Sequence, residues 1–482
     1  MKDPIRVIIA CDTFAPSING AARFAERLAG GLVRNGHDVH VIAPSNENWF
    51  GSRQETHDGA SITVHRLKSH RMPNHKSLRW PTPLGMRREI RKVILEVRPE
   101  ALHIQSHLMV GRFALLASRG INLRKIATNH VMPENLMRYS LLPRWLYPMA
   151  MRILWADAGR VLKKMDAITT PTRRAADLLE RAAGLQGVLA ISCGIDASKF
   201  ANQTPTQNSR PVALFLGRLD DEKRINVLLD AMSKLDKFPA LELRLVGDGG
   251  ERDRLTAQAK SLGLGERVHF LGHIGDSELP KAYEDCTVFV MPSIAELQSI
   301  ATMEAMASGR PIIAADAMAL PHLVHDGDNG YLFPPDDADA LRDRLERILS
   351  ADEAELARLS ENSIHLIQSH DIAKTITIFE NLYQGIGEEA PTTLDNEPSY
   401  MLPIGRLSAS LRRRVEEFRH DALNLRRRAE DASEYARGRF SGAAGEARER
   451  LLEVRGEVRE QLSEFRTELT EAAKKLRKKK GD

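Results

Sequence analysis

The 482-residue sequence has few of the features that mark secreted, metal-binding or membrane-spanning proteins. Its three cysteines, Cys11, Cys193 and Cys286, stand far apart and form no CxxC pair, which argues against a disulfide framework or a structural zinc site. No apolar run approaches the roughly 18 residues needed to cross a bilayer, and the N-terminal run IRVIIAC is too short for a secretory leader. We therefore expect a cytoplasmic protein without a metal site.

An excess of charge of one sign is also missing. The net charge of +4 comes from 69 basic and 65 acidic residues, so we expect no nucleic-acid partner. Hydrophobic residues make up 42% of the chain, which is ordinary for a globular protein. Because 482 residues are too many for one core, the length predicts two domains and an appendage.

Two series of alternating strand and helix patterns fill most of the chain. The first, over residues 1–200, begins with an apolar run at 5–10, a helix with one apolar face, and a second strand. The second, over 201–387, contains five strand candidates: VALFLGRL, LELRLVGDG, RVHFLGH, TVFVMPS and PIIAA. This alternation predicts two tandem Rossmann-like, doubly wound α/β domains, with ligands at the carboxyl ends of the strands in a cleft between them.

The last part of the chain differs in composition. Residues 388–403 are typical of a linker, and 404–482 are dominated by Arg, Lys, Glu and Ala, with apolar residues at helical spacing. This pattern predicts a charged amphipathic helical tail that pairs with itself or with another subunit. The terminal KKLRKKK holds six cations in seven residues, which favours contact with an anionic membrane surface, although a solvated basic end is the alternative. We expect a peripheral protein on the inner face of the cell membrane.

The segment SIAELQSIATMEAMASGRPIIAA places two carboxylates around the start of an expected helix. Glu296 follows the apolar run TVFVMPS, and Glu304 lies one or two turns inside the helix, which Gly309 ends. A helix N-terminus attracts phosphate, and carboxylates accept hydrogen bonds from vicinal hydroxyls. A nucleotide sugar fits this pattern, whereas solvated glutamates beside a helix start are the alternative. The amides would come from Gln298, Ser299 and Ile300.

Partners for a diphosphate occur on both predicted domains. Arg218 ends the first strand of the second domain and Lys223 begins the following helix, so they offer a guanidinium fork and a point charge. Gly20 opens the first helix of the opposite domain, where the lack of a side chain lets backbone amides approach phosphate. Since one diphosphate must contact both domains, we expect the cleft to narrow when the ligand binds.

Together these residues resemble the retaining glycosyltransferases of family four, which have the two-domain GT-B fold. The matching segments are the loop at Gly20, GRLDDEK, LVGDG, VHFLGH, and Glu296 with seven residues before Glu304, followed by EAMASGRPII. The resemblance implies that Arg218 and Lys223 hold the diphosphate, Glu304 the ribose, and Glu296 the hydroxyls of the transferred sugar. It also implies that no cofactor or metal is tightly bound.

Other segments resemble the branch of this family that glycosylates diacylglycerol-type lipids. These are the His-x-Gln at His103, the segment TNHVMPEN, and the Glu-x-Gln at Glu296. The resemblance implies transfer of a hexose, mannose or glucose, from GDP- or UDP-hexose to a membrane lipid. By position, His103 is the family's cleft histidine, and we predict that it orients the sugar or the acceptor; His107 and His130 are competing candidates.

Two segments mix aromatic residues with arginines, as is typical of a lipid–water interface. Segment 132–155 contains Tyr139 and Trp145, and segment 70–92 contains Trp80. We predict that Tyr139 and Trp145 lie on the acceptor side of the cleft. The alternative is that these aromatic residues pack on their own domain.

Three other functions share parts of this pattern. A dinucleotide-dependent oxidoreductase would need G-x-G-x-x-G and an acidic residue at the end of the second strand, but that strand ends VIAPS. A glycosyltransferase with a soluble or polysaccharide acceptor, and a nucleotide-sugar epimerase on the same fold, stay open as alternatives. A scaffold protein with an inactive site is disfavoured, because every charged site residue is present.

Overall fold

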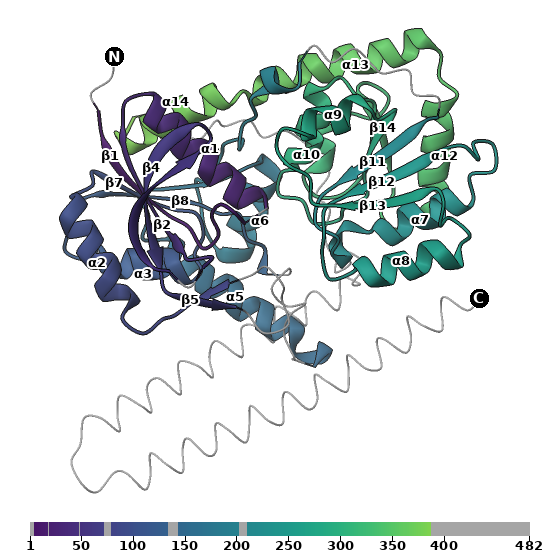
Figure 1. Cartoon of the computed structure of the whole chain (residues 1–482). Coiled ribbons are helices and arrows are strands. Elements are labelled where there is room, and N and C mark those ends of the chain that lie inside the picture. The colour runs from purple at the N-terminus through teal and green to yellow at the C-terminus, as the bar shows by residue number, and fades with distance from the viewer. Residues whose placement is uncertain are drawn as a thin grey trace, which may run out of the picture. The chain divides into compact units, whose positions relative to one another are not determined.

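The computed structural model describes residues 4–17, 19–47, 49–71, 79–133, 143–201 and 210–386. Within these ranges the chain forms two doubly wound α/β domains, which confirms the predicted fold class (Figure 1). The predicted linker 388–403 and helical tail 404–482 lie outside the described residues. Among the helices described, none has the length and apolar character to cross a membrane.

The first domain is built on an eight-stranded sheet in the order β10-β9-β8-β7-β1-β2-β4-β3. Its strands are β1 (Arg6–Ala10), β2 (Asp38–Pro44), β3 (Gly51–His57), β4 (Ala60–Leu67), β7 (Ala101–Ile104), β8 (Arg124–Thr128), β9 (Ala167–Thr170) and β10 (Leu189–Ala190). All neighbouring pairs are parallel except β3 with β4. A separate ribbon pairs β5 (Ser69–Arg71) with β6 (Arg79–Pro81).

Helices cover both faces of this sheet. They are α1 (Gly20–Arg34), α2 (Met86–Val97), α3 (Met109–Ala117), α5 (Tyr147–Leu162) and α6 (Arg173–Ala183), with short 3₁₀ turns η1 (Arg144–Leu146) and η2 (Ala197–Lys199). Alternate residues of β1 enter separate cores: Val7 and Ile9 pack with α1, whereas Ile8 packs with α2, α3, α5 and α6. Burial on both faces explains why this strand is a continuous apolar run.

The β3–β4 hairpin was not among the predicted strands. Its turn residues, Asp58 and Gly59, have positive φ angles of 46° and 74°. An Asp-Gly pair between two segments of suitable length is a strong hairpin signal, because type I′ turns need positive φ at both central residues. The turn was therefore indicated by the local sequence. The strand β3 was missed because its residues are mostly polar and show no apolar pattern.

The second domain is built on a six-stranded, wholly parallel sheet in the order β13-β12-β11-β14-β15-β16. Its strands are β11 (Val212–Leu216), β12 (Glu242–Val246), β13 (Val268–Gly272), β14 (Val288–Met291), β15 (Ile312–Ala315) and β16 (Gly330–Phe333). Five were predicted, and β16 was missed. The helices are α7 (Ile225–Ser233), α8 (Arg252–Ser261), α9 (Leu279–Glu284), α10 (Ile300–Ala307), α11 (Leu320–Leu323), α12 (Ala338–Leu349) and α13 (Glu353–Ile367), with turns η3 (Asp221–Lys223) and η4 (Gln368–His370).

The last described helix, α14 (Ile372–Tyr383), returns to the first domain (Figure 1). Phe379 lies in the core of that domain, with its ring centroid 5.6 Å from that of Phe24 on α1. The predicted range 201–387 for the second domain therefore includes a helix that packs on the first. The sequence could not indicate this, because an apolar helix face does not reveal which sheet it covers.

The chain thus crosses between the domains twice, and the two crossings are bonded to each other. The amide of Ile195 donates to the carbonyl of His370 at 2.8 Å, and the amide of Ile372 donates to the carbonyl of Ile195 at 3.0 Å. These bonds join the two connections into one short piece of parallel ladder.

Candidate functional site

The centre of the site is the start of α10, which follows β14 as predicted. Ser299 caps the helix, because its Oγ accepts a hydrogen bond from the amide of Thr302 at 3.3 Å. The helix ends before Gly309, which has a φ of +63°. Within the first turn, the amides of Ile300 and Ala301 have no partner in the helix, as is general for helix starts. They form the part of α10 best suited to bind an anion.

Lys223 and Glu296 come together beside this helix start. The Lys223 ammonium bonds directly to the Glu296 carboxylate, and only 14% and 10% of these side chains are exposed. Lys223 ends η3 after β11, and Glu296 follows β14, the strand next to β11 in the sheet. Adjacent parallel strands therefore bring together two residues that are far apart in the sequence.

Arg218 lies on the same loop as Lys223. Its guanidinium pairs with Asp220 and, at 2.9 Å, with Glu222. The carbonyl of Glu222 in turn accepts from the amide of Ile294 at 3.0 Å. The loop that carries Arg218 and Lys223 is thus fastened to the loop that carries Glu296, so the predicted phosphate-binding cations and the sugar-binding carboxylate belong to one unit.

Glu304 is buried in the second turn of α10 and contacts both domains. One carboxylate oxygen accepts from Arg27 of α1 at 3.0 Å, and the other accepts from the Tyr283 hydroxyl at 3.0 Å. The second guanidinium nitrogen of Arg27, Nη1, is buried and has no hydrogen-bond partner. Arg27 was not among the predicted site residues; the available signal was its position one turn after Arg23 on the helix that Gly20 opens.

Gly20 is the first residue of α1 and faces the second domain. A Cβ atom on Gly20 would lie 3.8 Å from Cδ1 of Ile300, the first residue of α10. The starts of the two helices therefore lie opposite each other. Asn19 caps α1 by accepting from the amide of Ala22 at 2.9 Å. Two helix starts that face one gap concentrate partial positive charge in it.

The predicted residues Gln298 and Ser299 have structural contacts of their own. The Gln298 carbonyl oxygen accepts from the amide of Cys193 at 2.7 Å, and its amide nitrogen donates to Ser192 at 2.9 Å. Gln298 thus holds the first crossing segment against the site, and Ser299 is the helix cap. Both side chains are bonded within the protein, and the binding of phosphate by the backbone amides of Gln298 and Ser299 stays a prediction.

His103 lies in β7 beneath α14, fully buried. Its Nδ1 bonds to the Tyr383 hydroxyl and its Nε2 to the Thr128 hydroxyl, both at 2.7 Å. Burial lowers its pKa to about 3, so the ring is neutral near pH 7. Because both ring nitrogens are occupied and the ring is covered, this geometry does not support the predicted direct role of His103 with the sugar or acceptor. It joins the first sheet to α14.

The two competing histidines differ in their hydrogen bonding. His130 bonds through Nε2 to the Gln105 side chain at 2.9 Å, and burial lowers its pKa to about 4. His107, in the loop between β7 and α3, is also buried, and burial lowers its pKa. Its Nδ1 has no hydrogen-bond partner. A buried polar atom without a partner calls for a ligand or a water, so His107 retains a ring nitrogen that can bind one.

The aromatic residues of the predicted acceptor side separate into two groups. Trp145 is 77% exposed, whereas Trp155 is buried in the core of the first domain. Met149 and Ile153, which follow Trp145 at steps of four residues, are 56% and 58% exposed. Residues spaced by four lie on one face of an α-helix, so Met149 and Ile153 share a face of α5. We call these two side chains, together with Trp145 of η1 just before the helix, the apolar stripe. Tyr139 lies outside the described residues.

The sequence is similar to those of known glycosyltransferases over both domains. The sequence profile described as "Glycosyltransferase Family 4" matches residues 18–199, and the profile "Glycosyl transferases group 1" matches residues 196–365. A GDP-mannose-dependent alpha-mannosyltransferase of Mycobacterium tuberculosis is 28% identical over 68% of this chain and 84% of its own length. A phosphatidyl-myo-inositol mannosyltransferase of Mycolicibacterium smegmatis is 28% identical over 78% and 94%.

Two more distant matches add to these. An alpha-monoglucosyldiacylglycerol synthase of Acholeplasma laidlawii is 23% identical over 68% of this chain and 85% of its own length. Among solved structures, Anabaena HepE in complex with UDP-glucose superimposes with a TM-score of 0.62 at 20% identity, covering 79% of this chain and all of the other. At that identity the likeness is evidence for the fold alone.

Proposed function

The chain belongs to glycosyltransferase family four and has the GT-B fold, and on that premise we propose that it transfers a hexose from a nucleotide diphosphate sugar to a membrane lipid with retention of anomeric configuration. The observation that carries this proposal is the Lys223–Glu296 pair at the start of α10, opposite the start of α1. A diphosphate at this point would contact Lys223, Arg218 and the first amides of α10. The relatives that act on phosphatidyl-myo-inositol and diacylglycerol lipids support a lipid acceptor.

Each carboxylate has a distinct part in this proposal. Glu304 accepts ribose hydroxyls, because each of its oxygens holds one protein donor and retains a second lone pair. Glu296 accepts hydroxyls of the transferred sugar through the oxygen that does not face Lys223. In this way both ends of the donor are fixed while the diphosphate lies between them, and the sugar is held for attack.

The transfer step needs stabilisation of a departing diphosphate. The bond from the anomeric carbon to the phosphate oxygen breaks while a bond to the acceptor oxygen forms on the same face. The acceptor hydroxyl loses its proton to the departing phosphate oxygen, so no side-chain base is required. Charge that develops on the diphosphate is stabilised by Lys223, Arg218 and the partial positive charge of the helix start. The proposed donors are UDP- or GDP-sugars that carry glucose or mannose.

A panel of labelled donors tests this function. We expect purified full-length protein to release UDP or GDP from one glucose or mannose donor only when extracted membrane lipids are added, with the hexose recovered on a lipid. The anomeric configuration of the product, read by NMR, should equal that of the donor. Nucleotide release that does not depend on the added lipid, or conversion of the donor sugar into its epimer, would contradict lipid glycosylation.

The apolar stripe of Trp145, Met149 and Ile153 supports membrane contact. The exposed part of α5 also carries Arg152 beside Ile153, so a cationic side chain accompanies the apolar ones. This combination suits a helix that lies in the interface of an anionic bilayer. We propose that this face holds the first domain at the membrane, near the lipid acceptor.

Replacing Trp145, Met149 and Ile153 together by serine should weaken binding to anionic vesicles by about tenfold or more, because each apolar side chain stabilises the bound state when it leaves water. Flotation with vesicles that contain phosphatidylglycerol measures this. The matched control is Ile364→Ser on α13, which removes a half-exposed isoleucine from the second domain. If the triple variant floats as well as the control, the stripe does not bind membrane.

A further inference from the structure

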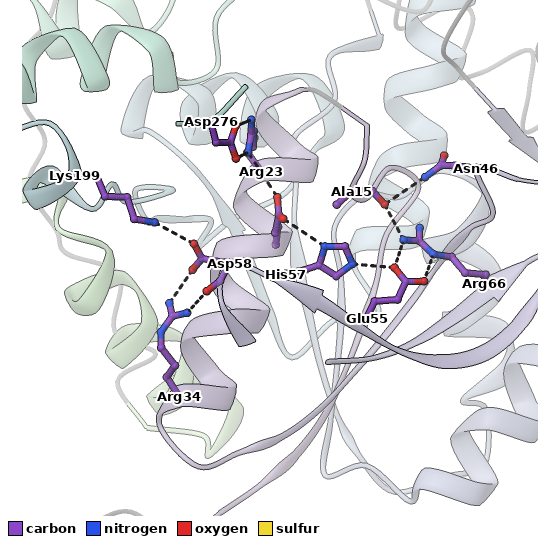
Figure 2. Close-up of polar contacts among 11 residues, drawn as sticks. Ala15, Arg23, Arg34, Asn46, Glu55, His57, Asp58, Arg66, Lys199 and Asp276 are labelled. Atoms are coloured by element: carbon purple, nitrogen blue, oxygen red, sulfur yellow. Dashed lines mark hydrogen bonds and ion pairs between the residues drawn. The ribbon is translucent and has the colours of Figure 1, made fainter. Parts of the chain in front are cut away.

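A pocket of about 320 Å³ lies at the edge of the first domain. It is lined by residues 15–17 after β1, residues 45–47 and Trp49 after β2, the β3–β4 hairpin and the start of α1, and by His273 and Asp276 of the second domain. Figure 2 shows part of its polar lining, including Glu55, His57 and Arg66. Its volume is at the low end of the range of about 300–1,000 Å³ for ligand pockets, which suits one ring-sized ligand.

One wall of the pocket is organised by Glu55. Arg66 donates to both Glu55 oxygens, at 2.6 and 3.0 Å (Figure 2), and Arg53 donates to one of them at 3.0 Å. Burial acts to raise the pKa of Glu55, but the hydrogen bonds from Arg66, His57 and Arg53 prevail and lower it to about 2. Arg66 also donates to the carbonyl of Ala15 at 2.8 Å, which fixes the loop after β1.

His57 joins this wall to α1. Its Nε2 lies 2.8 Å from Glu55 and its Nδ1 lies 3.4 Å from Glu26, so the imidazole stands between two carboxylates. Burial acts to lower the pKa of His57, but these two carboxylates prevail and raise it above the ordinary value. Protonation of the ring is therefore more favourable than in a free imidazole, and in the protonated form both nitrogens donate.

On the side of the second domain, the pocket is closed by Asp276 and its ion-pair partner, Arg23 of α1. Its guanidinium pairs with both carboxylate oxygens of Asp276, in the loop after β13, with one contact at 2.6 Å (Figure 2). All three arginines that line the pocket are thus already paired with carboxylates. An anionic ligand would have to displace a carboxylate, whereas a neutral ligand with several hydroxyls can donate to the carboxylates and accept from the cations.

Trp49 supplies the apolar part of the lining. The Arg53 guanidinium lies 4.3 Å from the centroid of the indole ring, which holds the ring in place. A flat aromatic ring packs well against the C–H face of a cyclic polyol while its surroundings bond the hydroxyls. The pocket therefore offers one apolar surface and a balanced set of donors and acceptors.

We propose that this pocket binds the uncharged, polyhydroxylated ring of the acceptor headgroup. The inference rests on the proposed function, because it names the acceptor class at the same cleft. The loop at 15–17 leads directly to α1, whose start faces α10. A ring held by Glu26, His57 and Trp49 would thus lie beside the donor site, and the Arg23–Asp276 pair would close over it on the side of the second domain.

Direct binding to full-length protein tests this assignment without nucleotide or lipid. The probes are methyl α-D-mannopyranoside and myo-inositol, with inorganic phosphate as the charged competitor, followed by saturation-transfer NMR. We expect at least one polyol to bind, phosphate not to displace it, and Glu26→Gln and Trp49→Ala each to raise its Kd by about tenfold, as for loss of a hydrogen bond to a charged group or of a stacking surface. Glu96→Gln on the exposed face of α2 is the control.

Polyol binding that is equal in the wild type, Glu26→Gln and Trp49→Ala would overturn the assignment, as would displacement by phosphate or the absence of polyol binding by the wild type. Because the binding assay contains neither donor nor lipid, it does not test hexose transfer, which is tested by the donor panel. Conversely, absence of transfer in that panel would not prevent a polyol from binding here. The two failures can therefore be told apart.

Discussion

Replacing Lys223 by alanine is expected to lower kcat by about 10²–10³-fold, the range seen when one donor that stabilises developing negative charge is removed. Lys223 is the cation that bonds Glu296 beside the start of α10, so it lies where the diphosphate would depart. Because the contribution of this ammonium grows as charge develops on the leaving diphosphate, the effect should fall on kcat more than on the KM for donor.

Steady-state nucleotide release with lipid extract measures this effect. The control is Lys234→Ala, which removes an exposed lysine that pairs with Asp339 at 3.0 Å on the surface of the second domain. The melting temperature of each variant must be recorded, because Lys223→Ala leaves the Glu296 carboxylate without this partner. A folded Lys223→Ala protein with kcat within threefold of wild type would refute the role of Lys223 as the leaving-group cation.

Glu304→Ala is expected to raise the KM for donor by about 10–100-fold and also to destabilise the fold. The donor effect corresponds to the loss of hydrogen bonds to a charged group. The fold effect arises because Glu304 pairs with Arg27 at 3.0 Å, and removal of one partner leaves a largely buried guanidinium unpaired. That loss costs about 3–5 kcal/mol in comparable buried pairs. Both expected effects, on donor binding and on stability, arise because the proposed donor-binding carboxylate also makes the interdomain contact with Arg27.

The two effects can be separated with a second variant. Glu304→Gln keeps the size of the side chain and an acceptor for Arg27 or Tyr283, so it should lose less stability than Glu304→Ala. Glu346→Ala, which breaks a surface pair with Lys237, is the matched control and should change stability by no more than about 1 kcal/mol. Thermal melting without nucleotide diphosphate measures the loss of stability, and the additional stabilisation when the nucleotide is present measures its binding. An unchanged KM for donor in folded Glu304→Ala would remove Glu304 from the donor site.

The residues at the centre of the candidate site could be picked out because their signals in the sequence are local. Glu296 and Glu304 stand out since an apolar strand, a cap residue and a helix follow one another within a short segment, and each of these has a physical signature in sequence. Arg218 and Lys223 follow the next strand of the same sheet in the same way. Parallel sheets bring the ends of neighbouring strands together, so the juxtaposition followed from the alternation of elements.

The contacts that were missed join segments far apart in the sequence. Arg27 reaches Glu304 across 277 positions, and Tyr383 reaches His103 across 280. No periodicity in one chain encodes such a pair, so His103 was assigned by its place in a motif, without knowledge of the helix that covers it. The β3–β4 hairpin is a different case. The Asp58-Gly59 turn is a local signal for a hairpin, but β3 is mostly polar and therefore lacks the apolar pattern by which the other strands were predicted.

The return of α14 has a consequence for synthesis on the ribosome. The nascent chain emerges from its N-terminus, so the strands and helices of the first domain are available long before α14 is translated. Until then Phe24 and His103 lack their contacts with Phe379 and Tyr383, and the part of this core that α14 covers is exposed to water. The whole second sheet can form in the meantime, since β16 precedes α14. The domain made first is therefore the one finished last, and the growing chain carries an open apolar surface that chaperones can bind throughout that interval.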